Sequence, residues 1–129
     1  MPDHDTHLRF DRNDQVERIR QYVVPGETLH AVFDCKGGGT GFVGLTDRRL
    51  IFYDQSFLHS HRSMISIPYW NIVGVAAADE GALLKPGEIT LLTSAGRFAF
   101  EFRETEHAHW AYEHIMSQIL ITAQPPVQR

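Results

Sequence analysis

The spacing of apolar residues changes twice along the chain and divides it into three parts. From Asp11 to Pro25, apolar residues recur every three or four positions, which predicts a short amphipathic helix. Residues 29–103 instead alternate between apolar and polar or form short apolar runs, a pattern typical of antiparallel strands. From Glu104 the three-and-four spacing returns and predicts a longer helix that ends before Pro125. Its apolar stripe consists of Ala108, Ala111, Tyr112, Ile115, Met116, Ile119 and Leu120.

Seven strands are expected in the middle part, each bounded by turn-forming residues. They span residues 29–35, 40–46, 50–53, 63–67, 72–77, 88–93 and 97–103. The last alternates most clearly, because Phe98, Phe100 and Phe102 point to one face, as in a half-buried antiparallel strand. The strand from Leu50 to Tyr53 is apolar on both faces, so we expect it to be covered on both sides. In the first strand, four alternate residues are expected to point to the same face: Leu29, Ala31, Phe33 and Cys35.

The length of the chain fits one domain. A chain of 129 residues lies within the usual size of a single domain, and neither a repeat nor a linker interrupts the pattern. We therefore expect a flexible lead-in at residues 1–10, a single domain at residues 11–123 and a tail at residues 124–129. From the periods alone, the fold class is mainly β: a barrel or sandwich with a terminal helix.

Three segments of the chain resemble a known family. They are Gly26-Glu27, the run from Gly44 to Tyr53 (GLTDRRLIFY) and the run from Ile67 to Ile72 (IPYWNI). Together they resemble bacterial PH-like domains of the YokE type and the related GRAM domains, over roughly residues 22–122. The resemblance implies a pleckstrin-homology-like antiparallel barrel of seven strands, capped by the C-terminal helix and preceded by a short N-terminal helix. It also implies a non-catalytic module that binds partner proteins or assembles with itself.

The charge of the chain narrows the choice of ligand. Twelve Lys and Arg stand against sixteen Asp and Glu, a formal charge of -4, so the chain lacks the basic surface that nucleic acid requires. Relatives that bind phosphoinositides carry several cations around the first hairpin, whereas this hairpin has only Lys36, which argues against phosphoinositide and membrane-surface binding. The alternative to a protein partner is an anionic lipid headgroup or small anionic ligand near Lys36, Arg48 and Arg62.

The chain contains no recognisable catalytic set. The glycines from Gly37 to Gly39 are not followed by the Lys-Ser or Lys-Thr pair and the helix that a phosphate-binding loop requires, so we interpret them as a hairpin tip. No Gly-x-Ser-x-Gly elbow occurs, and Cys35 is expected on the inward face of its strand, where a thiol is usually inert. We therefore predict no catalytic residue, no enzyme activity and no cofactor.

Histidines provide the candidate metal site. His59 and His61 would lie on the same side of an extended segment, as two ligands of one metal ion do. The second helix adds His107, His109 and His114. Because no Cys or carboxylate cluster completes either set and no His-Glu-x-x-His motif occurs, we prefer solvent-exposed histidines and predict no metal site.

The aromatic pair Tyr69-Trp70 and the strand after it form the candidate interface. Adjacent residues of a strand point to opposite faces, so both rings are buried only if one lies in the core and the other under the first helix. We favour that arrangement, and the alternative is that one ring is exposed to a partner. The strand at 72–77 has small apolar residues and no charge. We expect it at an edge of the sheet, where Val73 and Val75 would contact another protein or a second copy of the chain as a homo-oligomer.

The location of the protein is inferred from what the sequence contains. The single cysteine, Cys35, cannot form an internal disulfide, so the fold does not call for an oxidising compartment. No stretch approaches the roughly 20 apolar residues of a membrane span, and the first residues are polar and charged rather than signal-like. A cytoplasmic location is the resulting expectation.

Overall fold

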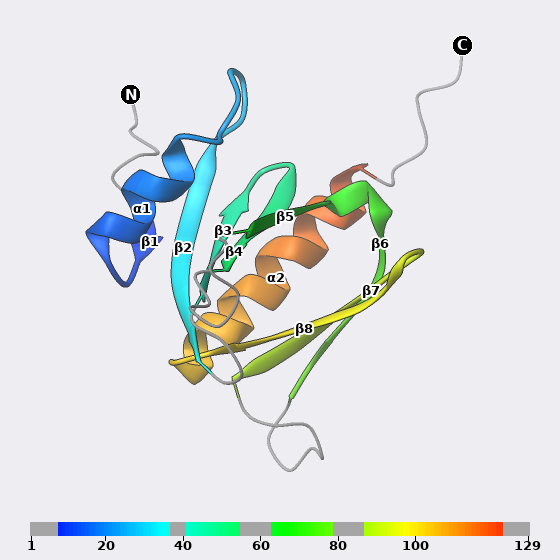
Figure 1. The fold of residues 1–129 in the computed structure, drawn as a ribbon. Coiled ribbons are helices and arrows are strands. Elements are labelled where there is room, and N and C mark those ends of the chain that lie inside the picture. The colour runs from blue at the N-terminus through cyan, green and yellow to red at the C-terminus, as the bar shows by residue number, and fades with distance from the viewer. Residues whose placement is uncertain (1–7, 37–40, 55–62, 79–86, 123–129) are drawn as a thin grey trace.

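The computed structural model describes residues 8–36, 41–54, 63–78 and 87–122. Within these ranges the chain forms one bent, mainly antiparallel sheet with a helix on each face (Figure 1). The short helix α1 (Asn13–Arg20) covers one face of the first strands, and the longer helix α2 (Thr105–Thr122) lies across the other face.

The described residues contain eight strands and a 3-10 helix. In chain order the strands are β1 (Arg9–Phe10), β2 (Leu29–Lys36), β3 (Gly41–Thr46), β4 (Arg49–Asp54), β5 (Ser63–Pro68), β6 (Ile72–Ala77), β7 (Glu88–Thr93) and β8 (Gly96–Phe102). Their order across the sheet is β5-β4-β3-β2-β8-β7-β6, and β1 pairs in parallel with β2. The 3-10 helix η2 (Tyr69–Asn71) connects β5 to β6. The seven expected strands are therefore present, and β1 is a short addition at the end of the expected lead-in.

The expected mainly antiparallel fold with a short N-terminal and a C-terminal helix is confirmed, but the sheet is open rather than closed. β5 and β6 stand at the two ends of the strand order and do not pair with each other in the described part of the chain. β2 and β8 join the two halves of the sheet only at Cys35↔Phe102 and Lys36↔Glu101. Among the described residues the sheet thus has two free edges, and β6 is at one of them, as the sequence predicts.

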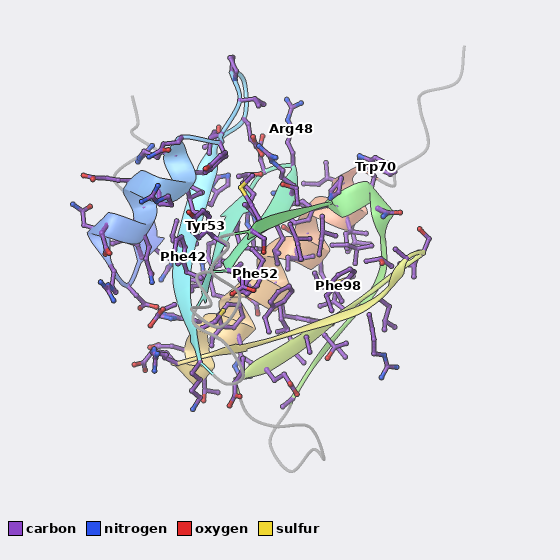
Figure 2. The ribbon with its side chains drawn as sticks, in the orientation of Figure 1. Phe42, Arg48, Phe52, Tyr53, Trp70 and Phe98 are labelled. Carbon is purple, nitrogen blue, oxygen red and sulfur yellow. The ribbon has the colours of Figure 1, made fainter. Side chains whose placement is uncertain are left out.

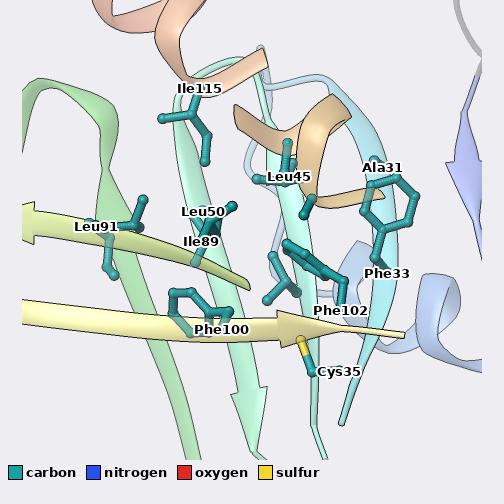
Figure 3. Packing of buried hydrophobic residues seen from close by; sticks show 14 of the residues in the cluster. Ala31, Phe33, Cys35, Leu45, Leu50, Ile89, Leu91, Phe100, Phe102 and Ile115 are labelled. Carbon is teal, nitrogen blue, oxygen red and sulfur yellow. The ribbon is translucent and has the colours of Figure 1, made fainter. Parts of the chain in front are cut away.

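Buried side chains form two clusters, one on each face of the sheet. The larger lies between the sheet and α2 and includes Phe33 of β2 and Ile115 of α2 (Figure 3). The smaller lies beneath α1 and joins Ile19 to residues of β2, β3 and β4. The segment from Leu50 to Tyr53 contributes to both clusters, which confirms that this strand is covered on both faces.

The start of β2 departs from simple alternation. The period of two predicts Leu29 on the same face as Ala31, but Leu29 lies in the smaller cluster beneath α1. A β-bulge between Leu29 and Ala31 changes the register, so the face to which side chains point is reversed there. Beyond the bulge, Phe33 and Cys35 occupy the inward face, as predicted.

The helix α2 buries only part of its apolar stripe. Ala108, Ala111 and Ile115 are fully buried, whereas Tyr112 is 36% exposed and Leu120 is 61% exposed. The stripe wraps around more of the helix than the open sheet can contact. Apolar side chains therefore remain on the exposed flank of α2, and Tyr112 stands beside β6.

Candidate functional site

The turn between β3 and β4 is organised by the buried side chain of Thr46. Its Oγ1 accepts hydrogen bonds from the backbone N–H groups of Arg48 and Arg49, both at 2.9 Å, and its hydroxyl donates to Glu27 Oε2 at 2.7 Å. Asp47, next in the turn, accepts from the backbone N–H of Thr28 at 2.9 Å. The turn is thereby fixed to the segment that leads into β2.

Glu27 and Arg49 form an ion pair at this turn. Arg49 Nε and Nη2 donate to the two oxygens of Glu27 at 2.8 and 2.9 Å, and Nη2 also donates to the carbonyl of Tyr22 at 2.6 Å. The side chain of Glu27 is 2% exposed. Burial alone would raise the pKa of Glu27, but hydrogen bonds from Arg49, Thr46 and the N–H of Val24 outweigh it and lower the pKa. Glu27 is therefore a charged structural residue at neutral pH.

The carbonyl oxygen of Thr46 connects the turn to η2 and α2. It accepts the hydroxyl of Tyr69 at 2.8 Å and lies 2.8 Å from His114 Nε2, which must carry a hydrogen because a carbonyl can only accept. The ring of His114 also stacks on Trp110, with centroids 4.9 Å apart. Desolvation lowers the pKa of His114, so the imidazole is neutral near pH 7. The three segments that carry the family resemblance thus meet at this point as structural elements.

The two rings of the candidate interface have different environments. Tyr69 is 1% exposed and lies in the core, where its hydroxyl donates a hydrogen bond to the Thr46 carbonyl. Trp70 is 77% exposed and lies at the outer corner between β5 and β6 (Figure 2). We therefore remove Tyr69 from the expected interface. The favoured arrangement, with the second ring under the first helix, is wrong, because Trp70 is exposed.

The free edge of β6 lies directly after Trp70. Val73 is 79% exposed, whereas Val75 is half-buried and packs against the core. In the described residues β6 pairs only with β7, so half of its backbone groups point away from the sheet. The other edge strand, β5, ends in Pro68 and carries Ser66, whose hydroxyl accepts from Arg49 Nη1 at 3.0 Å. The β6 edge is consequently the more apolar of the two.

A groove separates β6 from α2. It has a volume of about 480 Å³ and is lined by Val75, Ala76, Ala77 and Ala78 on one side and by His109, Tyr112 and Glu113 on the other. His109 Nε2 lies 3.3 Å from the carbonyl oxygen of Ala78. Tyr112 was not expected at a site, because the sequence assigns the whole apolar stripe of α2 to the core. The excess width of that stripe was the signal that could have placed Tyr112 at a surface.

Comparison with models of protein families shows which family the chain matches. The model of the GRAM domain matches residues 11–123 of the chain, which covers all of the described sheet and helices except the first residues. The chain belongs to the GRAM domain family. The predicted resemblance is thereby confirmed for the GRAM domain and for the PH-like fold that its structural neighbours share.

Three solved structures resemble this GRAM domain. The C-terminal domain of an unknown protein from Leishmania infantum is 26% identical, with a TM-score of 0.57 over 81% of this chain and 98% of that chain. A DUF1696-family protein with a pleckstrin-homology domain, from Shewanella loihica, is 17% identical, with a TM-score of 0.64 over 84% and 93% of the two chains. A pleckstrin-homology domain from Shewanella amazonensis is 20% identical, with a TM-score of 0.61 over 84% and 88%. A search of curated proteins found no match.

The family match indicates the general class of protein, and the two helices can be examined for a membrane span. PH-like and GRAM domains are generally non-catalytic binding modules, often for lipids or proteins. Within the described ranges of this GRAM domain, neither helix has the length and apolar character that crossing a membrane requires.

The expected anion-binding residues of the GRAM domain are not brought together. Lys36 is the last residue of β2, next to Cys35, which pairs with Gly41, whereas Arg48 lies in the turn at the opposite end of β3. At about 3.3 Å per residue, the six residues of β3 separate them by roughly 20 Å. Each cation also has an acidic neighbour at 3.7 Å, Glu101 for Lys36 and Asp47 for Arg48. Arg62 lies outside the described residues.

The histidines of the GRAM domain do not form a metal site where the structure describes them. No group of three or more His, Cys, Asp or Glu that could hold a metal ion occurs among the described residues. His107 stacks on Phe33, with centroids 4.0 Å apart, and its Nδ1 lies 3.6 Å from Asp11 Oδ1. His59 and His61, together with the glycines Gly37 to Gly39, lie outside the described residues.

Cys35 of the GRAM domain is buried in the core, as predicted. Desolvation, followed by the negative charge of Asp34, raises the pKa of Cys35 to about 12. A thiol with such a pKa is protonated at neutral pH and is a poor nucleophile. Its role in the structure is packing against its neighbours in the larger cluster.

Proposed function

We propose that this GRAM domain is a non-catalytic interaction module that binds a protein through the free edge of β6 and the exposed Trp70. The observation that carries the proposal is an uncharged edge strand whose outer side has no pairing strand among the described residues. Two of the most exposed large apolar side chains of the described chain lie at this edge, Trp70 just before β6 and Val73 within it. An edge strand offers backbone donors and acceptors to an incoming strand, and side-chain pockets beside it provide selectivity.

The comparison of the two edges supports β6. Protein edges that remain unpaired are usually protected by charge, proline or a covering segment. β5 contains Pro68 and polar serines, whereas β6 has the sequence IVGVAA and no such protection in the described residues. Exposed Trp is also among the residues that most often dominate binding energy at interfaces. The proposed interface consists of Trp70, Val73 and Val75.

Self-assembly is a second form of the same proposal, because a copy of the chain could occupy the edge.

The finer assignment to bacterial PH-like domains of the YokE type also belongs to the proposal, and it is supported by the TDRRL and IPYWNI runs. A cytoplasmic location is proposed with it, consistent with the free thiol of Cys35.

The experiment measures binding of a fluorescein-labelled peptide of about eight residues that alternates valine with threonine, since such a peptide can add a strand of typical length. Fluorescence anisotropy is recorded with the wild-type protein, with Val73→Asp and with the matched control Ile65→Asp on the other edge strand. Sedimentation velocity over a range of concentrations measures self-association in parallel. Ile65 is 40% exposed, so both substitutions place a charge at an exposed apolar site on an edge strand.

The proposal expects binding or self-association that Val73→Asp weakens about tenfold or more and Ile65→Asp leaves unchanged, because a charge on the edge opposes strand addition. A protein that neither binds the peptide nor associates would overturn it. Equal weakening by the two variants would also overturn it, because the effect would then be independent of β6.

A further inference from the structure

The groove between β6 and α2 indicates the chemistry of the partner. Resting on the proposed function, we infer that the occupant of the β6 edge is an extended segment of another protein that carries branched apolar residues at alternate positions and a Lys or Arg beside them. The apolar residues would fill the groove, and the cation would contact Glu113 and the ring of Tyr112.

The shape of the groove selects the apolar residues. Val75 and Ala77 lie on the same face of β6 and pack against the core, so their exposed sides form one wall of the groove. Tyr112 forms the opposite wall. A strand added to β6 would direct every second side chain into this space of about 480 Å³. Because Ala76, Ala77 and Ala78 are small, the added strand must provide the volume.

The charge of the groove favours a Lys or Arg side chain on the partner. Glu113 is exposed on α2, and its carboxylate has no ion pair or hydrogen bond with another residue of the described part of the chain. The other lining groups are apolar side chains, the phenol of Tyr112 and His109, whose Nε2 faces the Ala78 carbonyl. The described lining therefore contains one acid and neither Lys nor Arg. A cation next to a carboxylate and an aromatic face is favoured by both.

A second copy of the chain fits the groove poorly. If two β6 strands paired with each other, the residues entering each groove would come from the sequence IVGVAA. That strand has no cation to meet Glu113. Charge complementarity therefore favours a different protein as the partner.

The test uses two series of the fluorescein-labelled valine–threonine peptide. In one series a single threonine is replaced by lysine at each threonine position in turn, and in the other by glutamate. Each peptide is titrated into the full chain, into Glu113→Lys and into Glu17→Lys, and anisotropy is measured at low and at raised salt. Glu17 is an exposed acid on α1, so Glu17→Lys makes the same change of net charge away from the groove.

The inference expects that at least one lysine peptide binds the wild-type protein about fivefold more tightly than its glutamate twin, and that salt reduces the difference. Glu113→Lys should reverse this preference, and Glu17→Lys should retain it. If lysine and glutamate peptides bind equally and Glu113→Lys changes nothing, the inference is wrong while the edge-binding function stands. If no peptide of either series binds, the inference is overturned, and the edge-binding function is overturned with it only when the protein also fails to self-associate.

Discussion

Arg49 and Glu27, separated by 22 positions in sequence, are joined by two hydrogen bonds between guanidinium and carboxylate, at 2.8 and 2.9 Å. The pair connects the segment before β2 to the start of β4, and Glu27 is almost fully buried. A buried carboxylate that loses its partner keeps its desolvation cost and loses the compensating charge. The Gly-Glu and Thr-Asp-Arg-Arg-Leu runs of the sequence therefore serve the fold at this turn.

Replacement of Arg49 should destabilise the protein far more than replacement of Arg48. We predict that Arg49→Met lowers the free energy of unfolding by about 3 kcal/mol, because it leaves Glu27 buried without its ion pair. Arg48→Met should cost at most about 1 kcal/mol, because the Arg48 side chain is exposed and its pair with Asp47 is solvated. Urea denaturation measures both values. Equal losses for the two variants would show that the Glu27–Arg49 pair has no special role.

His114 should make stability depend on pH below neutrality. Its pKa in the folded state is lowered from the ordinary value of 6.5, chiefly by desolvation. Above pH 6.5 the imidazole is neutral in both the folded and the unfolded protein. Below pH 6.5 it takes up a proton in the unfolded chain but resists one in the folded protein. The free energy of unfolding therefore falls as pH falls from about 6.5 towards the folded pKa. His114→Gln should show a smaller fall between about pH 7.5 and pH 5.5, measured by urea denaturation. A steeper fall in the variant would reverse the assigned sign.

Gly41 is expected to tolerate no side chain. A Cβ atom there would lie 2.7 Å from the carbonyl oxygen of Tyr53 and 2.8 Å from the ring of Phe52, so the paired strands would have to move apart. We predict that Gly41→Ala lowers the free energy of unfolding by about 2 kcal/mol. Gly74→Ala is the matched control, because its nearest atom is the movable end of Leu92 at 3.2 Å. Thermal denaturation that ranks the control as the more damaging change would contradict the packing described for β3 and β4.

Anionic membranes should not recruit the protein through Lys36 and Arg48. The two cations lie at opposite ends of β3 and each has an acidic neighbour, so they cannot contact one headgroup together. We expect no flotation with vesicles of phosphatidylcholine containing about one fifth phosphatidylserine, even at low salt. Salt-sensitive flotation that Lys36→Ala abolishes would instead support the anionic-ligand alternative.

Much of the fold could be predicted because burial imposes a period on the sequence. The alternation of Phe98, Phe100 and Phe102, and the two-sided apolar character of the strand from Leu50 to Tyr53, follow directly from which faces are covered. The edge position of β6 was also predictable, because its small apolar residues and lack of charge distinguish it from the other strands. These features depend on neighbouring positions only.

The remaining features depend on residues that are distant in sequence. The pairing of Glu27 with Arg49 and the meeting of Tyr69 with the Thr46 carbonyl have no local signature. The bulge after Leu29 reverses a face without changing the alternation around it. The groove required knowing that the flank of α2 with Tyr112 lies beside β6, which only the packed structure shows.

The most direct test of strand addition is hydrogen–deuterium exchange of the backbone amides of Ile72–Ala77, measured with and without a saturating strand peptide. If the peptide pairs with β6, the amides that point away from β7 become donors in new hydrogen bonds, and we predict that alternate amides of β6 exchange at least about tenfold more slowly. Amides of the inner strand β3 should be unchanged. A bound peptide that leaves the exchange of β6 unaltered would contradict the claim that this edge is the binding surface.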